Sequence, residues 1–198
     1  MVRLLLEKGA NIEATRTDTG ATPLYSAGYN GHTDVVRLLL EKGANIEATG
    51  SDGSTALFNA SWRGHVGVVN LLLDKGANTE AARTSDGDAA LHAAASYLQI
   101  EVVRLLSEKG ANIHVASNQA YTALHMVFYV PTVDPHLQDP KQLIPTITVL
   151  LAHGANILQK DEDGDTPLDV AEQDGHLEAK QLFLQHLKER NLKPPQEA

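Results

Sequence analysis

Apolar residues occur in short runs that recur along the chain, separated by polar stretches that contain glycine. The run VVRLLLEKGANIEA at residues 35–48 returns almost unchanged at 1–14, 68–81 and 102–115, and more loosely at 147–158. Its valines and leucines form an apolar set too wide for one exposed helix to bury, and the glycine after them ends the helix. The pattern therefore predicts five helices that need neighbours to cover them. The glycines that end them are Gly9, Gly43, Gly76, Gly110 and Gly154.

A second, shorter block precedes each complete copy of this run. It reads TPLYSA at 22–27, TALFNA at 55–60, AALHAA at 89–94, TALHMV at 122–127 and TPLDVA at 166–171. The threonine hydroxyl of the first copy can cap a helix, and the proline occupies the first helical position, where its missing N–H costs nothing. The block thus predicts a short helix. In three copies a Gly-His pair follows it, at 31–32, 64–65 and 175–176.

The order and spacing of these blocks resemble the ankyrin repeat. The glycines of the long run are spaced by 34, 33, 34 and 44 residues, close to the ankyrin period of about 33. The resemblance covers residues 1–190. It implies an all-α ankyrin-repeat solenoid of stacked helix-turn-helix units with β-hairpin or loop fingers, elongated and with a concave face.

The same register divides the chain into a single array at 1–190 and a tail at 191–198. The predicted units are a partial repeat at 1–16 with the second helix only, repeats at 17–49, 50–83 and 84–116, a repeat at 117–159 with a proline-rich insertion at 131–146, and a C-terminal capping repeat at 160–190. Polar Lys180 and Gln181 suit a capping unit. The half-repeat leaves Leu4, Leu5 and Leu6 half covered. We expect a cut through a longer array there, or a half-repeat that a partner or a second copy covers.

The insertion at 131–146 holds four of the eight prolines, and we expect it to lack regular structure. It is either a protruding element that contacts a partner or a tolerated surface insertion. Two other positions depart from the repeat, because Leu98 replaces a turn glycine and Ala120 replaces a finger glycine. Both replacements cost stability if the backbone there needs a positive φ.

Composition narrows the possible partners. The net charge of −9 argues against binding to a nucleic-acid backbone. No apolar run approaches the roughly 18 residues that cross a bilayer, so we expect no membrane partner. The absence of cysteine removes disulfides and thiolate chemistry and favours an intracellular protein, cytoplasmic or nuclear.

The nine histidines and the aspartates suggest a metal site, but the repeat pattern accounts for the positions of five of the histidines. The resemblance implies that five histidines hold turns together by hydrogen bonds between units, and a spacing of one repeat keeps them too far apart to share an ion. These are His32, His65, His92, His125 and His176. We interpret the acidic stretch 160–169 as a solvated finger tip and not a calcium loop, because a predicted helix follows at once. No phosphate loop or nucleophile motif occurs. We expect no cofactor, no metal and no enzymatic activity.

Aromatic residues concentrate at one position of the repeat, the two residues before each turn. The pairs are Tyr29-Asn30, Trp62-Arg63, Ser96-Tyr97, Tyr129-Val130 and Gln173-Asp174. Four of the five pairs contain an aromatic residue, although the chain has only nine. In ankyrin arrays this position and the finger tips line the concave groove, so the resemblance implies partner contacts here. The alternative is that the aromatic rings only pack on neighbouring helices.

The predicted partner-binding residues combine this aromatic series with the acidic finger tips. They are Tyr29, Asn30, Trp62, Arg63, Tyr97, Tyr121, Tyr129, Asp18, Asp52, Asp86, Glu162 and Asp163. An aromatic floor with an acidic rim favours a protein or peptide that is neutral to basic. We expect a non-catalytic interaction module, part of a larger protein and monomeric unless the half-repeat self-associates. The alternative is a structural scaffold or regulatory segment that contacts only its own flanking domains.

Overall fold

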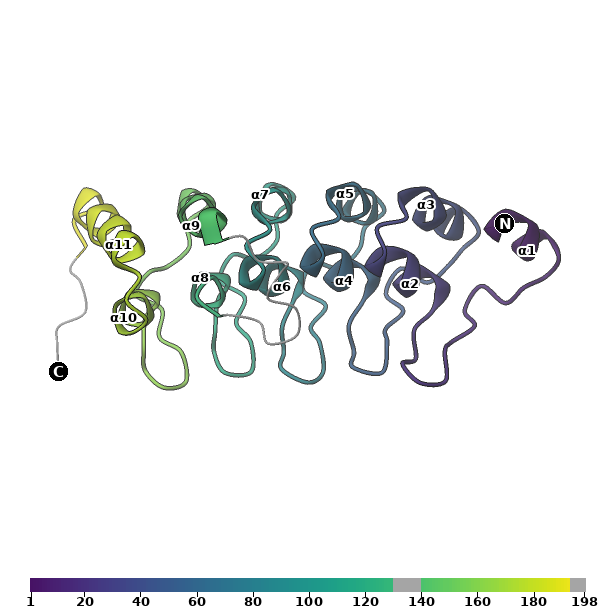
Figure 1. Cartoon of the computed structure of the whole chain (residues 1–198), viewed down its shortest axis with the longest axis horizontal. Helices are drawn as coiled ribbons and strands as arrows, with labels where there is room; N and C mark the ends of the chain where they lie inside the picture. Colours follow the sequence, from purple (N-terminus) through teal and green to yellow (C-terminus); the bar gives the residue numbers. More distant parts are fainter. Residues whose placement is uncertain (130–139, 193–198) are drawn as a thin grey trace.

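The computed structural model describes residues 1–129 and 140–192; most of the proline-rich insertion and of the tail lie outside the described residues. Within these limits the chain forms eleven α-helices and no β-strand. The helices stack in two rows along one long axis (Figure 1). The predicted all-α repeat solenoid is confirmed.

The first helix of each repeat lies in one row and the second helix in the other (Figure 1). The first row consists of α2 (Pro23–Tyr29), α4 (Ala56–Trp62), α6 (Ala90–Ser96), α8 (Ala123–Met126) and α10 (Pro167–Gln173). The second row consists of α1 (Val2–Glu7), α3 (Thr33–Glu41), α5 (Val66–Asp74), α7 (Ile100–Glu108), α9 (Leu143–Ala152) and α11 (Leu177–Glu189), with the 3₁₀ turn η2 (Pro140–Gln142) before α9.

One continuous apolar core lies between the rows. In α3, Val36 and Leu39 are 0 % and 1 % exposed, and the equivalent Val69 and Leu72 of α5 are fully buried. Each such side chain contributes about 1.5–3 kcal/mol by leaving water. Because a second helix packs on both neighbouring units, the core of each repeat depends on the next one.

Small residues bring the first helices close together. A Cβ added at Gly28 of α2 would lie 2.9 Å from the carbonyl oxygen of Ala56 in α4. Ala60 of α4 and Ala94 of α6, which are also small, are fully buried further along the row of first helices. The ends of neighbouring first helices therefore lie close enough for side chains of successive repeats to touch.

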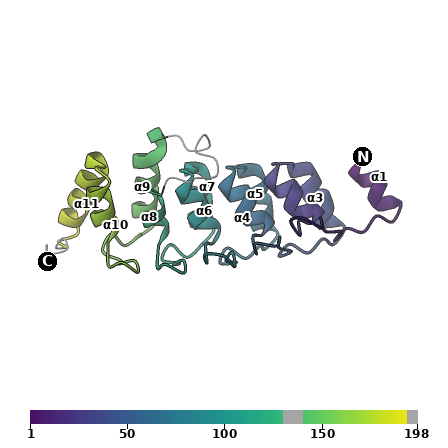
Figure 2. The same ribbon diagram turned by 60° about the horizontal axis from the view of Figure 1, so that its bottom comes forward.

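The fingers between repeats are loops, with a single isolated bridge between Thr49 and Thr55 among the described residues. They project together beyond the first row (Figure 1), and Figure 2 turns this side forward. One backbone hydrogen bond joins each finger tip to the next. The N–H groups of Ser51, Thr84, Asn118 and Glu162 donate to the carbonyl oxygens of Thr19, Asp52, Asp86 and Gln119, at 2.8, 3.1, 2.8 and 3.0 Å. We call the surface formed by the fingers and the first helices the inner face.

Two of the five histidines predicted to bond between units do so among the described residues, His65 and His125. His65 Nε2 lies 3.0 Å from the carbonyl oxygen of Tyr29, one repeat earlier. His92 Nε2 lies 3.0 Å from the carbonyl oxygen of Val115, at the end of its own repeat 84–116. Gln99, which replaces the turn histidine, donates to the Trp62 carbonyl oxygen at 3.5 Å and so occupies the same inter-repeat position.

The two ends of the array expose apolar side chains. Leu4 and Leu5 of α1 are 58 % and 52 % exposed, as the predicted half-repeat implies. At the other end Leu177 and Leu184 of α11 are exposed, so this outer surface is mixed and not purely polar. No helix in the described part of the chain is long and apolar enough to span a membrane.

The expectation that the insertion lacks regular structure as far as residue 146 is wrong. Helix α9 begins at Leu143, and Thr146 is fully buried in it. Pro145 lies in the first turn of this helix, where a missing backbone N–H removes no hydrogen bond. Residues 130–139 lie outside the described residues.

Leu98 and Ala120 do adopt the left-handed conformation, with φ of 52° and 59°. The equivalent turn glycines Gly31 and Gly64 have φ of 73° and 72°. The backbone at these sites is therefore set by the stacking of the repeats and not by the local residue. A side chain in this region costs about 1–2 kcal/mol.

We predict that Ala120→Gly stabilises the array by about 0.5–1 kcal/mol, because it relieves this strain. The free energy of unfolding in urea measures the effect. Gly164→Ala is the matched reverse change at the equivalent finger position, where φ is 89° and an added Cβ would meet no atom within 4 Å. It should destabilise by a similar amount. Unchanged stability in both variants would contradict the strain argument.

Candidate functional site

Three of the predicted aromatic residues form a contact row at the ends of the first helices. The Tyr29 and Trp62 ring centroids are 5.5 Å apart at an interplanar angle of 62°. Trp62 and Tyr97 repeat this edge-to-face geometry at 5.5 Å and 67°. Such contacts contribute about 0.5–1.5 kcal/mol each beyond area burial. The short spacing of α2, α4 and α6 brings the rings together.

The row is also part of the packing. Tyr97 is only 7 % exposed, so most of this ring packs against its neighbours. The indole N–H of Trp62 is buried and has no hydrogen-bond partner among the described residues. Arg63 lies over the Tyr29 ring at 4.8 Å and over Trp62 at 5.7 Å and covers one side of the row.

Tyr129 does not continue the row. Helix α8 ends at Met126, three residues earlier than the equivalent ends of α2 and α4, so the chain turns away before Tyr129. The Tyr129 side chain is 53 % exposed on the inner face. Tyr121, at the base of the same repeat, is half-buried, with its ring centroid 6.0 Å from that of His125.

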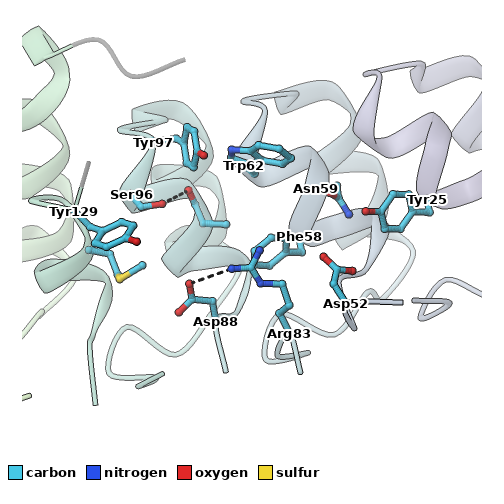
Figure 3. Close-up of a pocket in the computed structure, with 12 residues that line it drawn as sticks. Tyr25, Asp52, Phe58, Asn59, Trp62, Arg83, Asp88, Ser96, Tyr97 and Tyr129 are labelled. Carbon is cyan, nitrogen blue, oxygen red and sulfur yellow. Dashed lines mark hydrogen bonds and ion pairs between the residues drawn. The ribbon is translucent and has the colours of Figure 1, made fainter. Parts of the chain in front are cut away.

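The first pocket is a hollow of about 270 Å³ on the inner face, between the first helices and the fingers. Tyr25 and Tyr129 stand at its two ends, with Trp62 and Tyr97 along one side and Arg83 on the finger side (Figure 3). Residues of four successive repeats line it. They are Tyr25, Asp52, Phe58, Asn59, Trp62, Arg83, Asp88, Ala93, Ser96, Tyr97, Met126 and Tyr129.

Arg83 is the cation of the first pocket, and carboxylates of its own finger hold it. Its Nε donates to Asp86 Oδ1 at 3.1 Å, its Nη2 donates to the other Asp86 oxygen, and Asp88 lies 4.0 Å away. The guanidinium covers the Phe58 ring at 4.9 Å. Although burial opposes it, the hydrogen bond from Arg83 lowers the pKa of Asp86. The first pocket thus sets one guanidinium beside the carboxylates of Asp52, Asp86 and Asp88.

Asp88 lies 8 % exposed just before α6. Burial, and then the charge of Asp86, raise the pKa of Asp88 to about 6 against the attraction of Arg83. Its carboxylate is 4.0 Å from His92 Nδ1, but that nitrogen accepts the backbone N–H of Ala89. Burial lowers the pKa of His92, so the imidazole stays neutral and leaves the Asp88 charge uncompensated on that side.

A second pocket of about 230 Å³ adjoins the first and shares Met126 and Tyr129 with it. Its lining is aromatic and acidic: Tyr121, His125, Met126, Phe128, Tyr129, Asp161, Asp163, Asp165, Val170, Gln173 and Asp174. Burial, and then the charges of Asp161 and Asp163, raise the pKa of Tyr121. The surroundings of this tyrosine are thus negatively charged.

The acidic stretch 160–169 forms a finger tip that leads into α10. Asp161 Oδ1 accepts the backbone N–H groups of Asp163 and Asp165, at 3.0 and 2.9 Å, so this carboxylate holds the turn. Across residues 1–129 and 140–192 no group of three side chains is placed to hold a metal ion.

The remaining predicted site residues lie at different distances from the pockets. Asp52 lines the first pocket and Asp163 the second. Asp18 pairs with Arg16 at 2.7 Å on the first finger, and Asn30 caps the end of α2 with its amide on the Ser26 carbonyl oxygen. Neither of them lines either pocket, nor does exposed Glu162.

Sequence reasoning missed Tyr25, Phe58 and Arg83. Tyr25 and Phe58 are equivalent positions, each the third residue of its first helix. Alignment of the repeats could therefore have identified this second aromatic position, which lines the same pocket as Trp62 and Tyr97. Arg83 had no such signal, because its role depends on Asp86 and Asp88 of its own finger and on the Phe58 ring of α4.

Comparison with known families gave one finding. A family model described as ankyrin repeats (3 copies) matches residues 1–83 and 46–117, and these matches together span more than half of the 198 residues. The comparison with curated proteins found no match. The matched part includes the aromatic row, whereas Tyr129 and the second pocket lie beyond it.

We predict that Tyr97→Ala destabilises the array by roughly 3 kcal/mol, because it removes a buried ring and leaves a cavity beside Trp62. Tyr129→Ala is the matched control and should cost no more than about 0.5 kcal/mol, since that ring is half exposed. Urea unfolding followed by circular dichroism compares the two. Equal losses would contradict the assignment of the row to the packing.

We predict that the effect of Asp88→Asn depends on pH. Because the folded pKa of Asp88 is about 6 and its ordinary value is 3.8, the folded state alone holds this proton between these values. The resulting stability is fully present below about pH 4 and is lost as the pH rises through about 6. Asparagine is neutral throughout.

Asp88→Asn should therefore raise the free energy of unfolding by about 1–2 kcal/mol near pH 7.5, and the gain should shrink toward zero near pH 4. Urea titrations of wild type and variant at several pH values measure the difference. His125 is present in both proteins and does not contact Asp88, so its titration cancels. A difference that stays constant with pH would refute the buried charge.

Proposed function

Because this chain belongs to the ankyrin-repeat family, we propose that it acts by binding a segment of another protein on its inner face, with the first pocket at the centre of the contact. Ankyrin repeats are protein–protein interaction modules, and the family is typically non-catalytic. We also propose that the chain itself has no enzymatic activity and contributes recognition alone.

The observation that carries this proposal is the aromatic lining of the first pocket across successive repeats. Tyrosine and tryptophan are enriched among interface anchors, since they offer a large area and a polar group at low entropic cost. Trp62 forms one wall, and Tyr25 and Tyr129 stand at the ends. A segment lying along the array meets all three.

The size of the hollow also supports a protein segment over a small molecule. Sites for small molecules usually enclose about 300–1,000 Å³ and bury most of the ligand. The first pocket holds about 270 Å³ and continues into the second, so it suits individual side chains of a longer ligand. Because the first helices and fingers that form it are joined repeat to repeat, the surface is in place before binding.

The test compares proteins captured from a cell lysate by three immobilised forms of the full chain. The inner-face variant is Tyr25→Ala with Tyr129→Ala, which empties both ends of the first pocket and leaves the buried row intact. The control variant is Arg37→Ala with Glu41→Ala, two exposed residues of α3 in the other row. We expect some proteins to bind the wild type and the control at least tenfold better than the inner-face variant.

Thermal melting of all three forms verifies that they are equally folded. If each captured protein binds the three forms equally, the contacts lie elsewhere and the inner-face proposal fails. That result would favour the alternative of a scaffold that contacts only its own flanking domains.

A further inference from the structure

The first and second pockets form one groove with two different ends. They share Met126 and the half-exposed Tyr129, whose ring stands between them. An extended peptide advances about 3.3 Å per residue, so neighbouring side chains of one segment reach both hollows. The two ends can therefore select two different side chains of the same ligand.

The first pocket already contains its own cation. Arg83 is held by Asp86 and Asp88 and covers the Phe58 ring. The remaining walls, Trp62 and Met126 among them, are largely apolar. The charge of Arg83 repels a second cation, whereas an apolar side chain gains contact area on the rings.

The second pocket has the opposite balance. Four carboxylates line it, from Asp161, Asp163, Asp165 and Asp174. In its described lining, His125 is the one side chain that can carry positive charge, and burial lowers its pKa. His125 Nε2 also lies 3.3 Å from the Asp165 carbonyl oxygen, and this contact fixes the orientation of the imidazole ring. The negative charge of this pocket is therefore not neutralised from within.

The rings in this pocket point to the kind of cation. Tyr121, Phe128 and Tyr129 lie beside the carboxylates, and a lysine or arginine side chain places its methylenes on such rings and its charge at the rim. A bare metal ion is a poorer match, because in the described part of the chain no three ligands converge. The chain's net charge of −9 adds long-range attraction for a basic segment.

We propose that the second pocket receives a lysine or arginine side chain of the bound segment, while the first pocket receives an apolar side chain close to it. This inference rests on the proposed inner-face binding. The ligand is then an extended basic peptide, and the repeats at 117–159 and 160–190 bind its positive charge.

The test selects random linear peptides by display on the full chain. Three forms serve as bait: the wild type, the pocket variant Asp163→Asn with Asp174→Asn, and the control Glu41→Gln with Glu108→Gln. Asp163 and Asp174 are exposed, and their side-chain oxygens accept none of the hydrogen bonds found among the described residues. The control removes the same charge from exposed sites in the second row.

We expect peptides with a basic residue beside an apolar one from the wild type and the control, and loss of the basic residue from the pocket variant. Fluorescence anisotropy of a selected peptide should show roughly tenfold weaker binding to the pocket variant at low salt, and a smaller loss at high salt. The same peptide with its basic residue changed to methionine should bind the wild type and the pocket variant equally.

Two outcomes would overturn the inference. One is enrichment of basic residues on all three baits, which attributes the preference to overall charge. The other is equal weakening by the pocket variant and the control. Tyr25→Ala with Tyr129→Ala separates this failure from that of the proposed function: if it does not weaken the selected peptides, the inner face itself is not the binding surface.

Discussion

A short helix pair of this kind cannot bury its own apolar face, so contact between successive repeats is the constraint on which the rest of the structure depends. Val36 and Leu39 are buried in a core that runs without a break through the neighbouring units. The same contact recurs outside the core, where each finger tip donates one backbone hydrogen bond to its predecessor. Side chains also join successive repeats after the second helices: Glu13 accepts the backbone N–H of Asn45, and Glu47 accepts that of Asn78, both at 2.7 Å.

Stacking also explains why packing and recognition share residues. The close approach at Gly28 and Ala56 brings Tyr29 and Trp62 into edge-to-face contact, and the same geometry opens the hollow beside them. Tyr97 belongs to the packing and Tyr129 to the exposed surface, although both fall in the two-residue pair before the turn. The stable rings fix the shape of the groove, and the exposed ones are the part that a ligand can reach.

Charge distinguishes the two ends of the groove more than shape does. Both pockets are lined by aspartates, but only the first contains an arginine from a neighbouring finger. Arg83 lowers the pKa of Asp86 against burial, while Asp88, deeper and beside it, has its pKa raised. Counting acidic residues along the fingers cannot reveal this difference, because it depends on which side chains meet across the loops.

The sequence by itself determined the helix pairs, their order, the glycine turns and the His65 contact between repeats, because these depend on local pattern and recur along the array. It also placed Tyr29, Trp62 and Tyr97 in the two-residue pairs before the turns. Only the tertiary structure decided that α8 ends early and leaves Tyr129 exposed, that α9 includes Pro145, and that Arg83 lies beside Asp88 in the first pocket. These features depend on distances between side chains of different repeats, and the stacking of the units sets those distances.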